Sequence, residues 1–195
     1  MDRRTWLLVF MAATPPSDQS LLVRREGDRL RVTAPQIRFL NGRPLETLRN
    51  GASVSFASQI SLSTISVSSN SVSSETPPLL ARHVDRFVVS YDLWEEKFSA
   101  MRPGPPQRSV SRLTGPATEA WCLDQALPIP SALTPQRRFS VRLELRAEDP
   151  RETASVVGEP GINITRLIEI FSRPPRTQQP RWVAGAGPLR LEDLK

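Results

Sequence analysis

Apolar and polar residues alternate in two stretches of this chain, Arg86–Phe98 and Arg138–Arg146. Side chains of a β-strand point alternately to opposite faces, so this alternation is typical of a strand with one buried and one solvated face. The apolar sets are Phe87, Val89, Tyr91 and Leu93 in the first stretch, and Phe139, Val141, Leu143 and Leu145 in the second. The first stretch changes phase near Trp94, so the strand either bulges there and returns Trp94 to the core, which we expect, or exposes this aromatic as a mark of a partner surface.

Weaker alternation predicts further strands. The additional strand-like runs are Leu21–Leu40, Ser53–Val67, Ser109–Leu113 and Arg181–Val183 with Leu189–Leu191 as a tail. The phase of the second run shifts at Ser63–Thr64, which indicates a bulge or a bend. Three segments favour helix, namely Pro44–Arg49, Pro116–Leu127 and Gly161–Phe171. In the second of these, Asp124 interrupts the apolar stripe that helical spacing requires.

These elements predict an α+β domain that is mainly antiparallel β, a sandwich-like sheet with two or three short helices. We expect residues 1–20 to be a signal peptide with a linker, and residues 21–195 to form a single β-rich domain. A Ser-rich stretch around 66–80 is too polar to bury much surface, so we expect a mobile loop there.

The residues Met1–Ala13 have a charged start, a short apolar run and small residues at their end, as secretory signals do. A mildly apolar, frayed N-terminus is the alternative. We expect export to the periplasm or cell envelope, and otherwise a cytoplasmic protein. No stretch approaches the ~20 apolar residues that a membrane-spanning helix needs, so we predict no integral membrane span.

Charge narrows the choice of partners. The chain carries 26 basic and 20 acidic residues, and all of the basic ones are arginine except Lys97 and Lys195. The arginines are scattered along the sequence, whereas nucleic-acid binders concentrate positive charge on one stripe. This pattern favours arginine-rich coding or a generally basic surface, and it makes a nucleic-acid partner the weaker expectation.

The sequence predicts no catalytic, cofactor-binding or metal-binding residue, and no cofactor. Cys122 and His83 are the only cysteine and the only histidine, so they form the one Cys–His pair that could act as nucleophile and base. Cys122 lies between apolar neighbours, where a buried thiol is the more ordinary outcome. The carboxylates Asp92 and Glu96 share the polar face of their predicted strand, and Glu144 lies between Arg142 and Arg146. With arginine so abundant, this is typical of ion pairing across a sheet.

The order of elements resembles a family of uncharacterised bacterial envelope proteins that is described only as a β-domain of unknown function. The resemblance rests on Leu45-x-x-Leu48-x-x-Gly51 before an alternating strand, on Arg86–Tyr91 and on the strand Phe139–Leu145. An apolar helix entering the stretch Arg173–Trp182 completes it, so that it covers roughly residues 29–191. It implies an exported, β-rich domain with no assigned activity, and it transfers no functional residue.

We therefore expect a non-enzymatic exported or envelope protein of binding or structural type. Its partner is unknown, and another envelope protein is the candidate. The alternative is an arginine-driven binder of a polyanion or nucleic acid. An enzyme that uses Cys122 and His83 is the third class of function.

Overall fold

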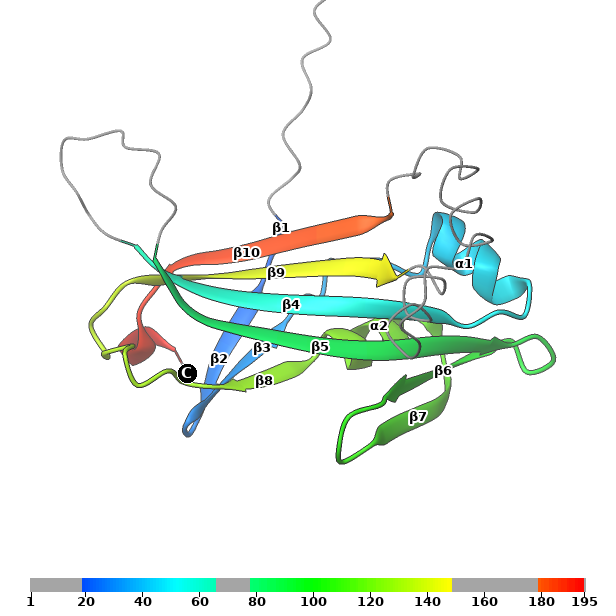
Figure 1. Ribbon diagram of the computed structural model, residues 1–195, viewed down its shortest axis with the longest axis horizontal. Coiled ribbons are helices and arrows are strands. Elements are labelled where there is room, and N and C mark those ends of the chain that lie inside the picture. The colour runs from blue at the N-terminus through cyan, green and yellow to red at the C-terminus, as the bar shows by residue number, and fades with distance from the viewer. Residues whose placement is uncertain (1–18, 66–77, 149–178, 195) are drawn as a thin grey trace, which may run out of the picture.

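Ten strands in the described part of the chain form two sheets that share one apolar core (Figure 1). The structure is a computed structural model that describes residues 19–65, 78–148 and 179–194. Seven strands form a large sheet and three form a small one. The described chain is thus mainly antiparallel β with two α-helices, which confirms the predicted class.

The large sheet contains, in spatial order, β1 (Gln19–Ser20), β10 (Arg181–Leu189), β9 (Phe139–Glu148), β4 (Val54–Thr64), β5 (Leu79–Asp92), β6 (Lys97–Arg102) and β7 (Arg108–Leu113). All neighbours are antiparallel except β1 and β10, which run parallel. The small sheet contains β2 (Leu22–Glu26), β3 (Arg29–Thr33) and β8 (Gln125–Pro128), all antiparallel. The backbone of Leu21, which donates a 3.0 Å hydrogen bond to Gly185, links the first strands of the two sheets.

One face of the large sheet is apolar because its central strands alternate as the sequence predicts. Every second residue of β4 and β9 is buried, starting from Val54 and Phe139. The bulge or bend predicted at Ser63–Thr64 is not in β4, whose burial alternates without a break through Thr64 and whose register with β9 is continuous. The register with β5 does shift between Leu62 and Ser63, and the extra residue is Leu80 of β5. Complete burial of each large apolar side chain contributes roughly 1.5–3 kcal/mol, so this alternation fixes which face of the sheet turns inward.

Four aromatic rings form the centre of this inner face. Phe39, Phe56, Phe87 and Trp182 lie with ring centroids 4.8 to 6.3 Å apart in the contacting pairs. Phe39 belongs to the segment between β3 and the first helix, which the alternation predicts to be a strand. It is buried but not in a strand, because Ala34–Ile37 closes a turn after Pro35. The alternation of apolar residues in this segment therefore indicates buried side chains and not a paired strand.

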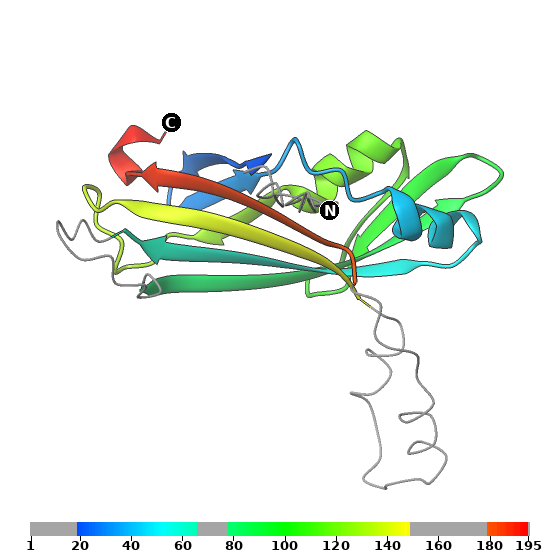
Figure 2. The ribbon, with the colours of Figure 1, turned by 90° about the horizontal axis from the view of Figure 1, so that it is seen from above.

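The small sheet and both helices cover the inner face, and all of them lie on the same side of the large sheet (Figure 2). Helix α1 (Gly42–Arg49) contacts β4 and β5, while α2 (Gly115–Leu123) contacts β6 and β3. A short 3-10 turn, η1 (Leu191–Asp193), follows β10. The two sheets are unequal, with three strands opposite seven, and the helices share the covering role. The predicted sandwich therefore stays a prediction.

Helix α1 confirms the helix predicted at Pro44–Arg49 and begins two residues earlier. Pro44 and Leu48 are its buried residues. Gly51 ends it with a φ of +83° and donates a 3.0 Å hydrogen bond to the carbonyl oxygen of Leu48. A positive φ of this kind favours glycine, which explains the residue at the helix exit.

The β-bulge predicted at Trp94 is wrong, because the chain reverses direction there. The carboxylate Oδ1 of Asp92 accepts hydrogen bonds from the amides of Trp94 (2.8 Å) and Glu95 (3.0 Å), and these bonds close a turn between β5 and β6. The same two amides hold the pKa of the Asp92 carboxyl below its ordinary value. Trp94 is 97% exposed and Leu93 is 54% exposed, so neither returns to the core.

The helix predicted over Pro116–Leu127 is half right. Helix α2 ends at Leu123, and Gln125–Pro128 is strand β8 of the small sheet. Asp124, the residue that breaks the apolar stripe, marks the boundary. Strand β5 begins at Leu79, inside the stretch expected to be a loop, whereas the predicted helix Gly161–Phe171 and residues 1–18 and 66–77 lie outside the described residues.

A buried arginine ties α2 to the large sheet. The guanidinium of Arg102, on β6, donates hydrogen bonds of 3.0 to 3.1 Å to the carbonyl oxygens of Trp121, Cys122 and Asp124 at the end of the helix. It also lies over the ring of Trp121, 5.0 Å from its centroid, with its Nε 3.3 Å from the carboxylate of Asp85 on β5. A cation at a helix C-terminus satisfies carbonyls that have no partner within the helix.

Replacing Arg102 by Met is expected to destabilise the fold by roughly 3 kcal/mol, since it leaves the buried carbonyl groups and the Asp85 carboxylate without a partner. The matched control is Arg112→Met, which removes one exposed ion pair with Glu95 and should cost less than about 1 kcal/mol. Urea unfolding monitored by tryptophan fluorescence measures both. Equal losses in the two variants would contradict the role given to Arg102.

Candidate functional site

The side of the large sheet turned away from the helices and the small sheet is polar, and we call it the outer face. No described helix or strand lies against it (Figure 2). It is formed by Ser55, Ala57, Gln59, Ser61 and Ser63 on β4, by Arg82, Val84, Arg86, Val88 and Ser90 on β5, by Arg142, Glu144, Arg146 and Glu148 on β9, and by Arg181, Val183 and Gly185 on β10. Short side chains thus follow the central strand β4, and long charged ones flank it.

Strand register places the arginines of the outer face in two rows across β4. Ser61 is opposite Arg82 on β5 and Arg142 on β9, and we call these three residues the Ser61 row. Ala57 is opposite Arg86 and Arg146 in the same way, and Arg146 is in turn opposite Arg181 on β10. These four residues are the Ala57 row. The two rows lie four residues apart along β4, or roughly 13 Å.

Two glutamates compensate the Ala57 row. Glu144 pairs with Arg146 at 3.4 Å and also with Arg181, and Glu148 pairs with Arg86 at 3.1 Å. The cross-strand pairing predicted for Glu144 is thereby confirmed. Because the arginine side chains of these pairs stay 52% to 66% exposed, the pairs orient them without removing them from water.

The Ser61 row is organised by hydrogen bonds instead of ion pairs. Arg82 donates to the amide oxygen of Gln59, and the amide nitrogen of Gln59 donates a 3.2 Å hydrogen bond to the hydroxyl of Ser61. Neither Arg82 nor Arg142 forms an ion pair within the part of the chain that the structure describes. This row therefore retains two positive charges without an ion-pair partner among the described residues, because Glu144, the neighbour of Arg142 on the same face of β9, pairs with Arg146 and Arg181 instead.

The outer face is the main functional feature that sequence reasoning did not identify. The sequence does contain a signal, because Arg82 and Arg86, like Arg142 and Arg146, are four apart and so share one strand face. The alternation alone led to the expectation of ion pairing. Only the register of β5 and β9 against β4 shows that the two pairs fall in common rows.

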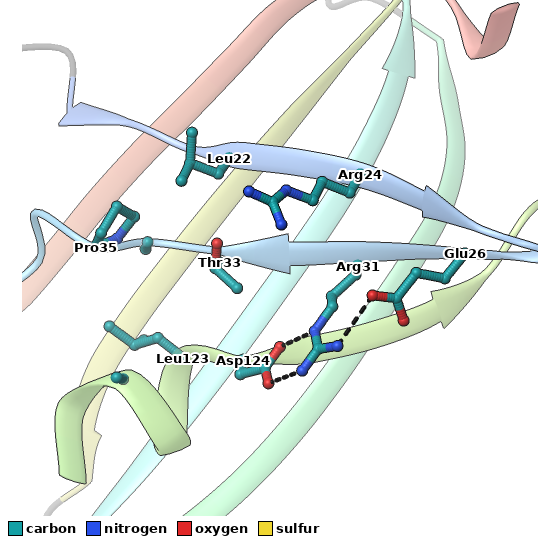
Figure 3. Close-up of a pocket in the computed structure, with 10 residues that line it drawn as sticks. Leu22, Arg24, Glu26, Arg31, Thr33, Pro35, Leu123 and Asp124 are labelled. Atoms are coloured by element: carbon teal, nitrogen blue, oxygen red, sulfur yellow. Dashed lines mark hydrogen bonds and ion pairs between the residues drawn. The ribbon is translucent and has the colours of Figure 1, made fainter. Parts of the chain in front are cut away.

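A groove of about 450 Å³ lies on the other layer, between the small sheet and α2 (Figure 3). Leu22, Pro35 and Leu123 provide apolar lining, and Arg24 and Arg31 provide charge. The groove is open, and its polar groups are largely engaged with each other rather than directed at a common point.

Ion pairs close the charged end of this groove (Figure 3). Arg31 donates two hydrogen bonds, of 2.7 and 2.6 Å, to the carboxylate of Asp124 and a third, of 3.0 Å, to Glu26. The bidentate contact holds the pKa of the Asp124 carboxyl below its ordinary value and raises the pKa of Arg31. This arrangement joins β2, β3 and the end of α2, and it has the character of a structural contact.

The structure does not make a catalytic pair of Cys122 and His83. Cys122 is fully buried in α2, and burial raises the pKa of its thiol to about 12. A nucleophilic cysteine needs the thiolate, which such a pKa suppresses near neutral pH. His83 is half-buried on β5, opposite Ile60, and no hydrogen bond joins it to Cys122 among the described residues.

The described residues contain no cluster of three or more His, Cys, Asp or Glu side chains that could hold a metal ion. None of the helices described is long and apolar enough to cross a membrane. Trp94 is the one exposed aromatic that the sequence marks as a partner contact, and it stands at the tip of the β5–β6 turn, apart from both arginine rows.

Comparison with known proteins adds no further assignment. No family model, no curated protein and no solved structure matches this chain. The expected likeness to a bacterial envelope β-domain family stays a prediction.

Alkylation tests the state of Cys122. We expect the folded protein to react with iodoacetamide at mildly alkaline pH far more slowly than the protein unfolded in urea, because the buried thiol is protonated. Mass spectrometry measures the labelled fraction. Rapid labelling under native conditions would revive the cysteine as a nucleophile.

The stability of the protein at acid pH tests the Arg31–Asp124 contact. A carboxyl whose pKa is lowered by folding stabilises the fold above its unfolded pKa, and this contribution is lost as the pH falls through the folded pKa. Asp124→Asn should therefore lose less stability than the wild type between pH values well above and well below about 3.9. Urea midpoints at the two pH values provide the comparison, and equal acid sensitivity would contradict the assignment.

Proposed function

We propose that this chain is a non-enzymatic binding domain that holds an acidic polymer on the outer face of the large sheet. The observation that carries the proposal is the charge of this face. Its strands β5, β9 and β10 contribute five arginines and only two glutamates to the Ala57 row, the Ser61 row and their neighbours. The alternative raised by the sequence, an arginine-driven polyanion binder, thus gains a specific surface.

The fold supports this use of the outer face. The small sheet and the helices are committed to the apolar inner face, so they hold the large sheet rigid from behind (Figure 2). Arginine offers several N–H donors in a planar fork that matches carboxylate, sulfate and phosphate groups. Serine and glutamine between the arginines add neutral donors, so the surface suits a ligand that presents many oxygens.

The buried state of Cys122 supports a non-enzymatic role, because the thiol of the chain's one cysteine is shielded from solvent and its pKa is raised. We further propose that the protein is exported, on the pattern of Met1–Ala13. Fusion of the full chain to a reporter that is active only after export tests this part separately. Retention of the reporter in the cytoplasm would remove the envelope assignment and leave the binding surface untouched.

Heparin-affinity chromatography tests the binding function with two variants that lose the same charge. The face variant changes the five arginines 82, 86, 142, 146 and 181 to Gln, and the control variant changes five exposed arginines elsewhere, at 24, 25, 29, 43 and 49. Both remove five positive charges from a chain whose formal net charge is +6. We expect wild type and control to be retained and released by salt, since binding to a polyanion releases counterions.

The face variant should elute at clearly lower salt than the control. Thermal unfolding of both variants serves as the check that the fold is retained. Equal elution of the two variants would mean that net charge alone causes retention, and failure of the wild type to bind at physiological ionic strength would contradict the proposed function.

A further inference from the structure

We infer that the Ser61 row is an oxyanion-binding subsite and that the polymer it takes is an acidic polysaccharide. This inference rests on the proposed function of the outer face and names its specific contact and ligand class. In it, Arg82 and Arg142 grip one sulfate or carboxylate group from two sides, and Ser61 donates to it from below.

The register provides the geometry of the grip. Neighbouring strands lie roughly 4.8 Å apart, so the backbones of Arg82 and Arg142 are about 10 Å apart on either side of β4. The residue between them is short, so nothing on β4 in this row stands between the two guanidinium groups. Two long side chains can then converge on a single group placed over Ser61.

The hydrogen bonds beside the row engage Arg82 and the acceptor side of the Ser61 hydroxyl. Ser61 accepts from the amide of Gln59, which in turn accepts from Arg82. A hydroxyl that accepts one hydrogen bond keeps its own O–H free to donate. The chain of bonds therefore fixes Arg82 and leaves the Ser61 hydroxyl as a donor toward a bound anion.

The neighbouring row explains why the subsite is at Ser61 and not at Ala57. Arg86, Arg146 and Arg181 already have glutamate partners, and Ala57 has no hydroxyl. An anion there would compete with Glu144 and Glu148, which hold fixed positions beside it. The Ala57 row can attract a polymer at long range, whereas the Ser61 row can hold one of its groups directly.

The side chains around the row favour a polysaccharide over other polyanions. The large aromatic side chains of the central strands, Phe56, Phe87, Phe139 and Trp182, belong to the inner face, so the outer face lacks the stacking surface on which single-stranded nucleic acids depend. Within the described residues, it also presents no helix or ribbon that could enter a duplex groove. Arginine and serine are its most frequent residues, whereas the centre of a protein–protein interface is enriched in aromatic residues and depleted in charge.

Isothermal titration calorimetry with a heparin-derived oligosaccharide tests the subsite. Ser61→Ala removes one hydroxyl without changing charge and should weaken binding roughly tenfold, as expected for a hydrogen bond to a charged group. The matched control is Ser55→Ala, which removes the same group from the same face of β4 in a position flanked by Val88 and Glu148. We expect Ser55→Ala to bind within about twofold of the wild type, because it removes no donor beside an arginine.

A pair of double variants tests the arginines. Arg82→Gln with Arg142→Gln should weaken binding more than a hundredfold, and Arg29→Gln with Arg43→Gln, which removes the same charge far from the outer face, should weaken it only slightly. If both Ser61→Ala and the Arg82/Arg142 variant bind like the wild type while the five-arginine face variant does not, the subsite is wrong and the proposed function stands. If the wild type does not bind the oligosaccharide, both fail.

Competition identifies the class of polymer. Single-stranded DNA and poly-glutamate of matched charge are titrated under the same conditions. We expect the heparin oligosaccharide to bind most tightly, and its advantage should shrink in Ser61→Ala. A tighter complex with DNA or with poly-glutamate, lost in the same variants, would overturn the assignment to polysaccharides and reassign the subsite to that polymer.

Discussion

A seven-stranded sheet has two faces, and the described chain buries the apolar side chains of only one of them. The inner face takes the fully buried phenylalanines and the even-numbered apolar residues of β4, and the small sheet and both helices pack on it. Alternation then sends every other side chain of the same strands to the opposite side, where burial cannot stabilise it. The arginine rows exist because the core is one-sided. Arg102 is needed for the same reason, because one layer has to be held on the sheet. It donates hydrogen bonds to the carbonyl oxygens at the end of α2, where the covering layer meets the sheet.

Local pattern was sufficient for most of the fold. The strands β4, β5, β7 and β9 and the helix α1 follow from alternation and from turn residues. Two of the errors arise where an aspartate marks a change in the path of the chain. The side chain of Asp92 bonds to backbone amides and closes a turn at Trp94, and Asp124 stands at the end of α2, where its side chain pairs with Arg31 of β3. The burial of Phe39 outside any strand is a tertiary effect, because three other aromatic rings surround it.

The candidate site depended on information that a single sequence does not contain. Arg82 and Arg142 are sixty residues apart, and only the pairing of β4 with both β5 and β9 places them on either side of Ser61. A slip of one residue in either pairing would send an entire set of side chains to the other face. The sequence was more informative about Cys122. Its apolar neighbours already indicated a buried thiol, and its complete burial confirms this. Composition showed that arginine is abundant, and register shows where it is concentrated.

The most direct test of the account is to map where a short heparin oligosaccharide touches the protein by NMR, following backbone amides and arginine side-chain N–H groups during titration. The account predicts that the largest shifts fall on Ser61, Arg82 and Arg142, that smaller ones fall on the Ala57 row, and that the groove beside α2 stays unchanged. Shifts that centre on Arg24 and Arg31, or that spread evenly over arginines on both layers, would contradict a binding surface on the outer face.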